Sequence, residues 1–468
     1  MSTQLSPQEL IERTLQAASS DSALHDCIVI VESRTQSNLR WASSTLTTNG
    51  VIEERKVTVV AFTPLDGGMA AGAVTVTSLE VENISTVLAS AKAAALAGGK
   101  SEDAADLARD VALGDWNASH IATGPEVFAG IAPKIGDAFK RSTADGIELF
   151  GYAEHTHDSI WIGSKGGMRL RFDQPDGRIE MTGKSHNRTR STWAGRATRD
   201  FTNVSIEGVD AEICQRLDWQ GTKIDIPAGR YDTVLPPGSV ADLYTYMVWM
   251  MDGKDADEGR SVFSKQGGAG TRIGEALSNK NFTFISDSNY KGLESAPFSS
   301  ATIGSSMSSL YDNGQPLNRT EWVKDGVLKA LIRTRASAAS SGDAYTPFGQ
   351  NFIIEVPGST GDLNAMVKTV DDGLLVTTLW YIRLVDPTTL LLTGLTRDGV
   401  YKVEGGEVVG AVNNFRWNDS PIELLQRIKA VGATEITQPR EWAGDLARAA
   451  APAMVFEGFN MSTVSKGN

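Results

Sequence analysis

Histidine side chains are the first residues whose type and spacing could support chemistry, because imidazole nitrogens bind transition metals and exchange protons near neutral pH. Two of the five histidines lie in the run 154–158, EHTHD. Residues two apart on a strand share a face, so His155 and His157, together with His186, could bind a metal. The alternative is a solvated strand whose histidines have no joint role.

Arg333 and Arg335 form a second candidate site. They follow the turn at Gly326 and stand two residues apart. If this segment is a strand, both guanidinium groups project to one face, where their forked donors could hold a carboxylate. We therefore predict that Arg333 and Arg335 contribute to a substrate or partner cavity. The alternative is an exposed edge on which both arginines form surface salt bridges.

The segment 168–199 is basic in an otherwise acidic chain. It contains eight Lys and Arg residues against three acids. Such a surface could meet an acidic partner or the carboxylates of a peptide. Alternatively, its charges pair with acids elsewhere in the fold. The basic residues are Arg169, Arg171, Arg178, Lys184, Arg188, Arg190, Arg196 and Arg199.

Two familiar motifs are incomplete. The glycine-rich run 267–270 lacks the Gly-Lys-Ser/Thr ending of a phosphate loop and does not match the dinucleotide fingerprint, so we interpret it as a flexible surface loop. The run 304–308, GSSMS, lacks the second glycine of a nucleophile elbow, and no histidine follows His186. A Ser-His-Asp hydrolase with the usual α/β-hydrolase order is therefore excluded.

Composition narrows the class of partners and the compartment. The formal net charge of −13 repels a nucleic-acid backbone, so we expect no nucleic-acid partner. Two cysteines, Cys27 and Cys214, cannot build a disulfide framework, which is typical of a reducing compartment. The N-terminal residues show no secretory signal, and charged residues and a proline interrupt the most apolar window, 374–395. We therefore expect a cytoplasmic protein without a membrane span.

The elements that must position these residues divide the chain into two parts. With 468 residues, 41% of them hydrophobic, the chain is long enough for two or three domains. Ser6, Pro7 and Glu9 form a capping box at the first helix. We assign residues 1–225 to an N-terminal α+β domain. Its expected strands are 27–32, 56–62 and several short ones with glycine turns (163–167, 175–177) within 146–199, and its further helices are 84–97, 102–113, 125–141 and 209–220.

The second half is richer in short strands. Turn pairs such as Asp325-Gly326 and Asp398-Gly399 are typical of hairpins. We assign residues 226–468 to a mainly antiparallel, barrel-like C-terminal domain, so the whole fold is α+β. One helix is expected at 421–430, and another begins at Ser239 and Asp242 and is closed by Gly253. The expected strands are 231–235, 281–285, 326–333, 352–355, 374–384, 389–397 and 400–412.

Three blocks of the second half resemble one peptidase family. The stretch 310–342, LYDNGQPLNRTEWVKDGVLKALIRTRASAASSG, has an acidic–glycine turn, a threonine, a hairpin of the form nGvLk and an SA…G ending. The stretch 394–428 contains paired hairpins followed by a helix, and the stretch 452–464 ends in FNMSTV. These motifs resemble the TldD/PmbA metallopeptidase family from about residue 229 to the C-terminus, and more loosely from about 27 to 199.

The zinc motif of that family is degenerate in this chain. Catalytic TldD-like chains carry an H-E-x-x-x-H helix shortly before G-x-S-V-F-S, and the run 259–264, GRSVFS, matches the latter. Counting back places Tyr244, Thr245 and Trp249 where the first His, the Glu and the second His would stand. Zinc prefers imidazole, thiolate or carboxylate ligands, and its water needs a carboxylate nearby. The family's C-terminal cysteine ligand is also missing, because no Cys follows Cys214.

The resemblance implies a role without catalysis. The chain is similar to the TldE (PmbA) type of subunit, which implies a heterodimer with a TldD-like, zinc-bearing metallopeptidase. Zinc would be in that partner, and this chain would hold no cofactor. It would form one wall of a cavity for unfolded peptides or a peptide-like natural product and help to position the substrate's amide. Tyr244 and Trp249 would either belong to the core or face that cavity or the partner.

Two alternatives to this role remain open. The first is a regulatory binding protein, because relatives of the family have been labelled modulators of DNA gyrase. The second is a homodimer with its own metal chemistry at His155 and His157.

Overall fold

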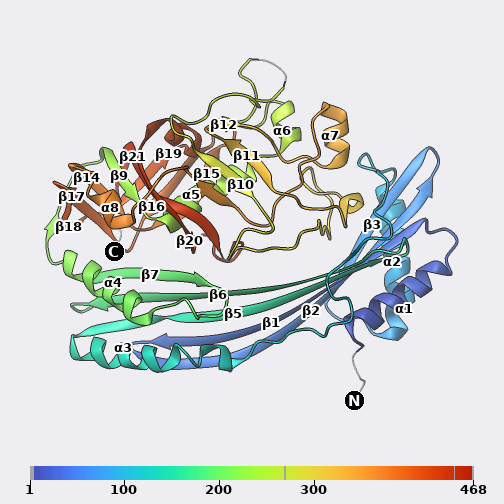
Figure 1. The fold of residues 1–468 in the computed structure, drawn as a ribbon, viewed down its shortest axis with the longest axis horizontal. Coiled ribbons are helices and arrows are strands. Elements are labelled where there is room, and N and C mark those ends of the chain that lie inside the picture. The colour runs from blue at the N-terminus through green and yellow to red at the C-terminus, as the bar shows by residue number, and fades with distance from the viewer. Residues whose placement is uncertain (1–4, 268–269, 447, 466–468) are drawn as a thin grey trace.

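The N-terminal half forms a curved, mainly antiparallel sheet that is built around long strands (Figure 1). The computed structural model describes residues 5–267, 270–446 and 448–465. Strand order across this sheet is β3-β2-β1-β5-β6-β4, and β7 pairs with β6. The strands are β1 (Asp26–Ala42), β2 (Thr45–Leu65), β3 (Gly68–Val76), β4 (Ala112–Leu113), β5 (Ile147–Ser164), β6 (Arg169–Ser185) and β7 (Arg190–Thr198).

Helices cover one face of this sheet in two groups. Val29 and Val31 of β1 pack under the first group, while Met181 of β6 packs under the second. The predicted capping box is confirmed, since the Ser6 hydroxyl and the Glu9 carboxylate each accept from the other's backbone N–H. The first group is α1 (Pro7–Ser19) and α2 (Ile84–Gly98), preceded by η1 (Val81–Asn83); the second is α3 (Ala132–Ala144) and α4 (Ile206–Trp219), with η2 (Pro125–Phe128) before α3.

The C-terminal half contains a large sheet and a small one. The large sheet has the order β12-β11-β10-β13-β21-β9-β14-β17-β18-β8, with β20 on β21, and the small sheet has the order β15-β16-β19-β22. The strands are β8 (Lys223–Ile224), β9 (Gly229–Leu235), β10 (Thr283–Ser286), β11 (Thr320–Lys324), β12 (Val327–Leu328), β13 (Ile353–Glu355), β14 (Asp372–Val376), β15 (Leu379–Asp386), β16 (Leu391–Thr396), β17 (Val400–Glu404), β18 (Glu407–Val412), β19 (Phe415–Asp419), β20 (Ile428–Thr437), β21 (Ala449–Met461) and β22 (Thr463–Val464).

The helices of this half are short, and one of them is central. Helix α5 lies in the largest apolar core, among side chains from both sheets. Helix α5 spans Pro237–Trp249. The other helices are α6 (Gly253–Asp257), α7 (Arg335–Ser341), α8 (Leu363–Val367) and α9 (Pro421–Leu424), and the single turns are η3 (Leu310–Asp312) and η4 (Leu425–Arg427). The prediction of an α+β fold with mainly antiparallel sheets is confirmed.

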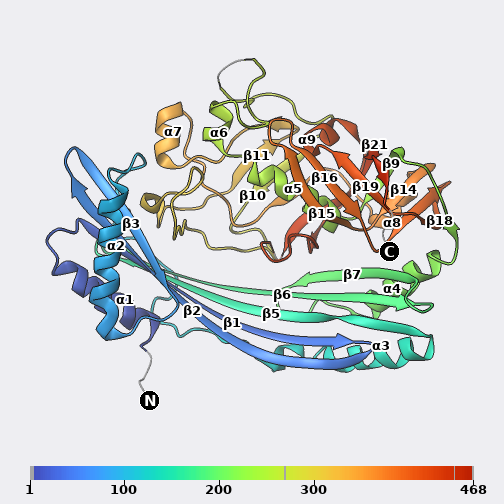
Figure 2. The same ribbon diagram turned by 180° about the vertical axis from the view of Figure 1, so that it is seen from behind.

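The C-terminal half lies over the face of the first sheet that the helices leave free (Figures 1 and 2). Because side chains alternate along a strand, Ile28 and Ile30 of β1 point to this face. They share an apolar cluster with Phe298 and Tyr311 from the second half. Polar contacts reinforce the junction, such as the ion pair of Arg199 with Glu294 at 2.6 Å.

The strands expected at 27–32 and 56–62 are present but much longer than predicted. Strands β1 and β2 pair from Asp26↔Phe62 to Ala42↔Thr45, with a bulge at Arg40/Trp41, so most of the polar residues between the two expected strands also belong to β1 and β2. Likewise, the expected turn at 175–177 lies inside β6. Pro175 is tolerated there because β7 pairs with β6 only from Gly177 onward, which leaves an open ladder edge beside the proline.

Several other element predictions need correction. No helix forms at 102–113, where an irregular segment leads into β4. The window 374–384 contains parts of two strands in different sheets, and Asp398-Gly399 connects β16 to β17, which also belong to different sheets. The helix expected at 421–430 ends early, since Ile428 already begins β20. The hairpin at Asp325-Gly326 is confirmed, with positive φ angles of 50° and 80° that suit a tight two-residue turn.

Within the part of the chain that the structure covers, none of the helices combines the length and apolar character that crossing a bilayer requires.

Candidate functional site

Helix α5 carries Tyr244, Thr245 and Trp249, the three residues that the sequence analysis assigned to the zinc-motif positions, and it starts and ends differently from the prediction. Its N-cap is Pro236, without a side-chain hydrogen bond, so Ser239 and Asp242 do not cap it. The helix ends at Trp249, and Gly253 starts α6 instead of closing α5.

Asp242 instead anchors a distant segment to the helix. Its carboxylate is buried and accepts backbone N–H groups from Arg440, Glu441 and Trp442 at 2.9–3.2 Å. Burial raises the pKa of Asp242 well above its usual range, while these three donors oppose the shift. The aspartate therefore holds the 440–442 segment against α5 without a cationic partner.

Tyr244 and Thr245 are buried and committed to local structure. The Tyr244 ring packs on Phe282 with centroids 5.5 Å apart, and its hydroxyl lies 3.4 Å from the Pro421 carbonyl oxygen. The Thr245 hydroxyl donates to the Ala241 carbonyl within the same helix, at 2.8 Å. Burial also raises the pKa of Tyr244 above its usual range, so it stays a neutral phenol.

Trp249, at the third position, packs in a cluster of aromatic side chains. Its ring lies 5.0 Å from Tyr246 and 4.8 Å from Trp442, both edge to face. Trp442 belongs to the segment that Asp242 anchors. The three positions thus present a phenol, an internally bonded hydroxyl and an indole, which do not fit zinc. No cluster of three or more His, Cys, Asp or Glu side chains suited to a metal occurs among the residues that the structure describes.

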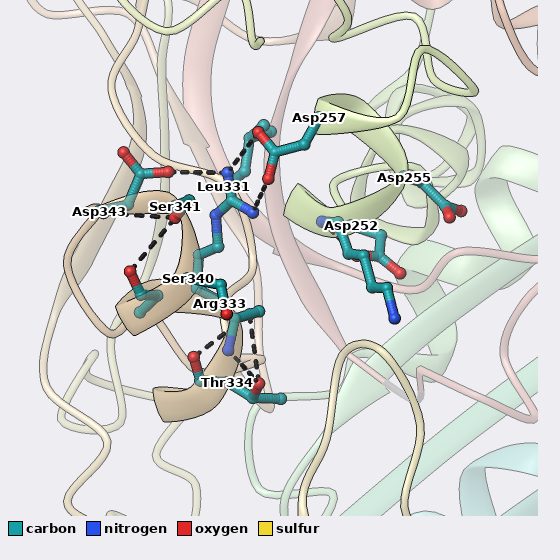
Figure 3. Close-up of polar contacts among 12 residues, drawn as sticks. Asp252, Asp255, Asp257, Leu331, Arg333, Thr334, Ser340, Ser341 and Asp343 are labelled. Atoms are coloured by element: carbon teal, nitrogen blue, oxygen red, sulfur yellow. Dashed lines mark hydrogen bonds and ion pairs between the residues drawn. The ribbon is translucent and has the colours of Figure 1, made fainter. Parts of the chain in front are cut away.

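Arg333 and Arg335 do not share a strand face as predicted. Strand β12 ends at Leu328, and Arg335 begins α7, so the two side chains diverge. Arg333 is only 1% exposed and forms ion pairs with Asp257 of α6 and, at 2.7 Å, with Asp343 (Figure 3). Arg335 pairs with Asp312 at 2.6 Å. Both guanidinium groups are therefore already occupied by carboxylates of the chain.

The Arg333 pair lies at the floor of a cleft with a volume of about 680 Å³. Four acids and two cations line it, so its charge is negative, and Ser and Thr hydroxyls supply most of its remaining polar groups. We call it the Arg333 cleft. Its walls are Glu102, Asp103, Lys254, Asp257, Glu258, Gly304, Ser305, Ser306, Arg333, Thr334, Ala336, Ser337, Ser340 and Ser341.

The Arg333 cleft continues into a smaller cavity of about 260 Å³, with Ser305, Arg333 and Thr334 in both. The smaller cavity is more apolar, since Met307 and Phe348 help to line it. Sequence reasoning found Arg333 but missed its partners Asp257 and Asp343. Only the chain path through α6 and α7 brings them together, and no local pattern signals that contact.

The proposed metal site at His155, His157 and His186 is wrong. His155 and His157 do share a face, but His186 lies beyond the far end of β6, nine residues from the His155 partner Gly177, or roughly 30 Å along the strand at the usual rise per residue. His155 is already satisfied, because its Nε2 donates to the Arg199 carbonyl and its Nδ1 accepts from the Thr123 hydroxyl. His155 therefore helps to hold the segments that cover the sheet, whereas His157 packs against the His120 ring with centroids 6.1 Å apart.

Acid should destabilise the chain through these histidines. Burial lowers the pKa of His120, His155 and His157. The unfolded chain, with a histidine pKa of about 6.5, then binds more protons than the folded one, so their contribution is complete above that pH and is lost as the pH falls below it. We expect the urea midpoint to fall between pH 7 and pH 5. The decline should be shallower in His155→Gln and unchanged in the control His25→Gln, which alters an exposed histidine; equal slopes in all three would contradict this.

The basic segment 168–199 is largely neutralised within the chain. Six of its seven arginines pair with carboxylates of the chain, five of them with acids from other elements, which agrees with the alternative interpretation. The recorded pairs are Arg169 with Glu12, Arg171 with Asp173, Arg178 with Glu154, Arg188 with Glu148, Arg196 with Glu212, and Arg199 with Glu294. Of the glycine-rich run 267–270, residues 268 and 269 lie outside the described residues.

Known proteins share both the C-terminal sequence and the whole fold. A family model, the PmbA/TldA metallopeptidase C-terminal domain, matches residues 228–463. TldE from Thermococcus kodakarensis superposes with a TM-score of 0.74 at 14% identity, over 96% of this chain and 99% of that chain. No curated protein sequence matches the chain significantly.

Two further solved structures are described as candidate modulators of a DNA gyrase. The one from Thermotoga maritima has a TM-score of 0.73 and 16% identity, covering 97% of this chain and 99% of that chain. The one from Bacteroides thetaiotaomicron has a TM-score of 0.70 and 15% identity, covering 98% and 99%. At these identities the likeness establishes the fold alone.

Proposed function

We propose, because this chain belongs to the PmbA/TldD metallopeptidase family, that it is the non-catalytic, TldE-like subunit of a two-chain zinc peptidase. The observation that carries the proposal is how the side chains of helix α5 at the motif positions are packed and bonded. Tyr244, Thr245 and Trp249 occupy the motif positions, and each is engaged by packing or hydrogen bonding inside the chain. In this proposal the zinc belongs to a TldD-like partner and this chain holds no cofactor.

The chain's own contribution is a wall of the substrate chamber. The Arg333 cleft lies where α6 follows the degenerate helix, since the Gly253 N–H donates to the Ile332 carbonyl at 3.0 Å next to Arg333. Its hydroxyls and carboxylates can accept the N–H groups of an unfolded peptide or a peptide-like product, and its smaller apolar extension can take a side chain. Hydrolysis of the amide bond occurs in the partner.

An exposed edge strand supports association with another chain. Strand β3 pairs with β2 only from Val57 onward, so within the part of the chain that the structure describes residues 45–56 of β2 pair with β1 alone. Leu46, Val51 and Ile52 in this stretch are about half exposed. Free edges with exposed apolar residues are usually protected by a charge, a proline or a covering element. We propose that the TldD-like partner covers this edge.

Replacing Ile52 by lysine should weaken that association without unfolding the chain. A charge on the free edge opposes strand pairing and apolar contact, while the exposed position leaves stability within about 0.5 kcal/mol. We expect at least a roughly tenfold weaker complex by titration calorimetry. Leu96→Lys, at a similarly exposed apolar position on α2, is the matched control and should bind normally. If Ile52→Lys binds the partner with unchanged affinity, the interface lies elsewhere on the chain.

Co-expression tests the subunit proposal. With a chain of the same family that carries H-E-x-x-x-H, we expect a stable 1:1 complex in size-exclusion chromatography and zinc in stoichiometric amount only in the partner. The isolated chain should retain no stoichiometric zinc. Elution as two separate species, or zinc bound by the chain alone, would refute the proposal.

A regulatory role is the second candidate, favoured by the description of two structures of the same fold as candidate gyrase modulators. It predicts that the isolated chain binds DNA gyrase without a peptidase partner. A pull-down with purified gyrase separates the two roles, because the subunit proposal expects no binding there.

A further inference from the structure

A cavity larger than the Arg333 cleft lies away from helix α5, where the two halves of the chain meet. It has a volume of about 860 Å³, within the range of small-ligand sites. The β6–β7 hairpin, the 223–225 segment and strands β15, β16 and β18 surround it. We call it the seam cavity. The argument below uses Lys184, Lys223, Trp380, Tyr381, Arg397 and Asn413, all of which line it.

The seam cavity is positively charged in a chain that is strongly acidic. Four cations line it against two acids, Asp225 and Asp398. Asp398 is already engaged, because it accepts from Arg440 at 2.7 Å and from the Ser191 hydroxyl at 3.1 Å. By contrast, Lys184 and Lys223 form no ion pair among the described residues: Glu148, opposite Lys184 on β5, pairs with Arg188, and the Lys184 ammonium lies 5.6 Å from the centroid of the Phe150 ring. Two ammonium groups are therefore available to an anion.

One wall of the cavity is aromatic and firmly built. The guanidinium groups of Arg397 and Arg440 each lie over the Trp380 ring, 5.2 Å from its centroid. The Arg440 guanidinium also lies over the Trp193 ring of β7, 4.6 Å from its centroid. These stacked side chains therefore connect the two halves of the chain. Such cation–π contacts fix the orientation of Trp380.

The next residue, Tyr381, has an unusual backbone conformation and a largely exposed side chain. Its φ angle is +53°, and its side chain is 57% exposed. A bulky residue in the left-handed region is strained, and such strain persists mainly where the surrounding structure imposes it, often at binding sites. A buried donor without an acceptor, the Asn413 side-chain nitrogen, also lies at this cavity.

We propose that the seam cavity binds the C-terminal carboxylate end of a peptide. Lys184 and Lys223 attract the carboxylate, the Asn413 amide offers it a neutral donor, and Trp380 and Tyr381 pack against the last apolar side chain. An inorganic phosphate shares the anionic chemistry but makes no use of the aromatic wall. Only the choice of a peptide as ligand rests on the proposed function, because the charge and the aromatic wall stand independently of it.

Binding to the isolated chain tests this site directly. The probe is the N-acetylated tripeptide Ala-Ala-Phe with a free carboxylate, titrated by calorimetry, with its C-terminal amide as the comparison. We expect the acid to bind about tenfold more tightly than the amide, and its affinity to fall as salt rises. The double variant Lys184→Gln/Lys223→Gln should lose this preference. Lys329→Gln, at an exposed lysine outside the cavity, should keep it.

Two outcomes would overturn the assignment. Equal affinities for the acid and the amide would exclude a carboxylate site, and phosphate that binds more tightly than the peptide would show a simple anion site. Trp380 fluorescence provides a second measurement, because the acid should quench it in the parent chain and leave a Trp380→Phe variant unchanged. No partner subunit or hydrolysis enters this experiment, so its failure is distinguishable from failure of the proposed function.

Discussion

Replacing Asp242 by alanine is expected to lower the free energy of unfolding by about 3–5 kcal/mol. The carboxylate is fully buried and accepts three backbone N–H groups, from Arg440, Glu441 and Trp442. Its removal leaves three buried donors without a partner, and each such donor costs about 1–3 kcal/mol. Urea unfolding followed by circular dichroism measures the loss.

The same substitution should also uncover Trp249. Trp442 packs on Trp249 at 4.8 Å and is held there through Asp242. We therefore expect a red-shifted tryptophan emission in Asp242→Ala and a smaller change in Asp242→Asn, which keeps one acceptor. Asp145→Ala, a substitution at an exposed carboxylate, is the control and should change stability by less than about 0.5 kcal/mol. A loss below about 1 kcal/mol in Asp242→Ala would mean that water replaces the carboxylate.

Installing the zinc motif should unfold the chain instead of activating it. The triple variant Tyr244→His, Thr245→Glu and Trp249→His removes two aromatic rings from packed positions and places a carboxylate where only 3% of the threonine is exposed. Lost packing and an unpaired buried charge together cost about 4 kcal/mol or more. We expect a large drop in the urea midpoint and no stoichiometric zinc by elemental analysis.

The single variants of this set show which substitution causes most of the loss of stability. Thr245→Glu alone should account for most of the loss, whereas Trp249→His, at a half-buried position, should fold and remain inactive. Zinc-dependent peptide hydrolysis by Trp249→His alone would show that the assignment of the motif positions is wrong. A stable triple variant that binds zinc would show that α5 can open, against the packing described here.

Local signals in the sequence were sufficient for some elements and insufficient for others. The capping box of α1 and the turn at Asp325-Gly326 were predictable, because both depend on residues within four positions of each other. The long strands β1 and β2 were not, because their polar middle sections lack the alternation that identifies a half-buried strand. Residues 102–113 are rich in alanine and acids, yet their tertiary contacts keep them irregular.

For the candidate site too, some features depend on local sequence signals and others depend on distant contacts. The assignment of Tyr244, Thr245 and Trp249 to the motif positions depends only on counting back from the run 259–264, and it stays a prediction. The role of Asp242 could not be predicted, because its partners lie about two hundred residues further along the chain. The prediction that Arg333 and Arg335 share a strand face was wrong, because α7 starts at Arg335, which a strand-like sequence context conceals.

The central claim is that this chain supplies no catalytic group, and reconstitution with the TldD-like partner tests it most directly. Peptide hydrolysis should be absent in this chain alone and should appear in the mixture. It should be abolished when the partner's motif glutamate is replaced by glutamine, yet survive Tyr244→Phe in this chain. Chelator-sensitive hydrolysis by the pure chain, or by a complex whose partner lacks that glutamate, would contradict the account.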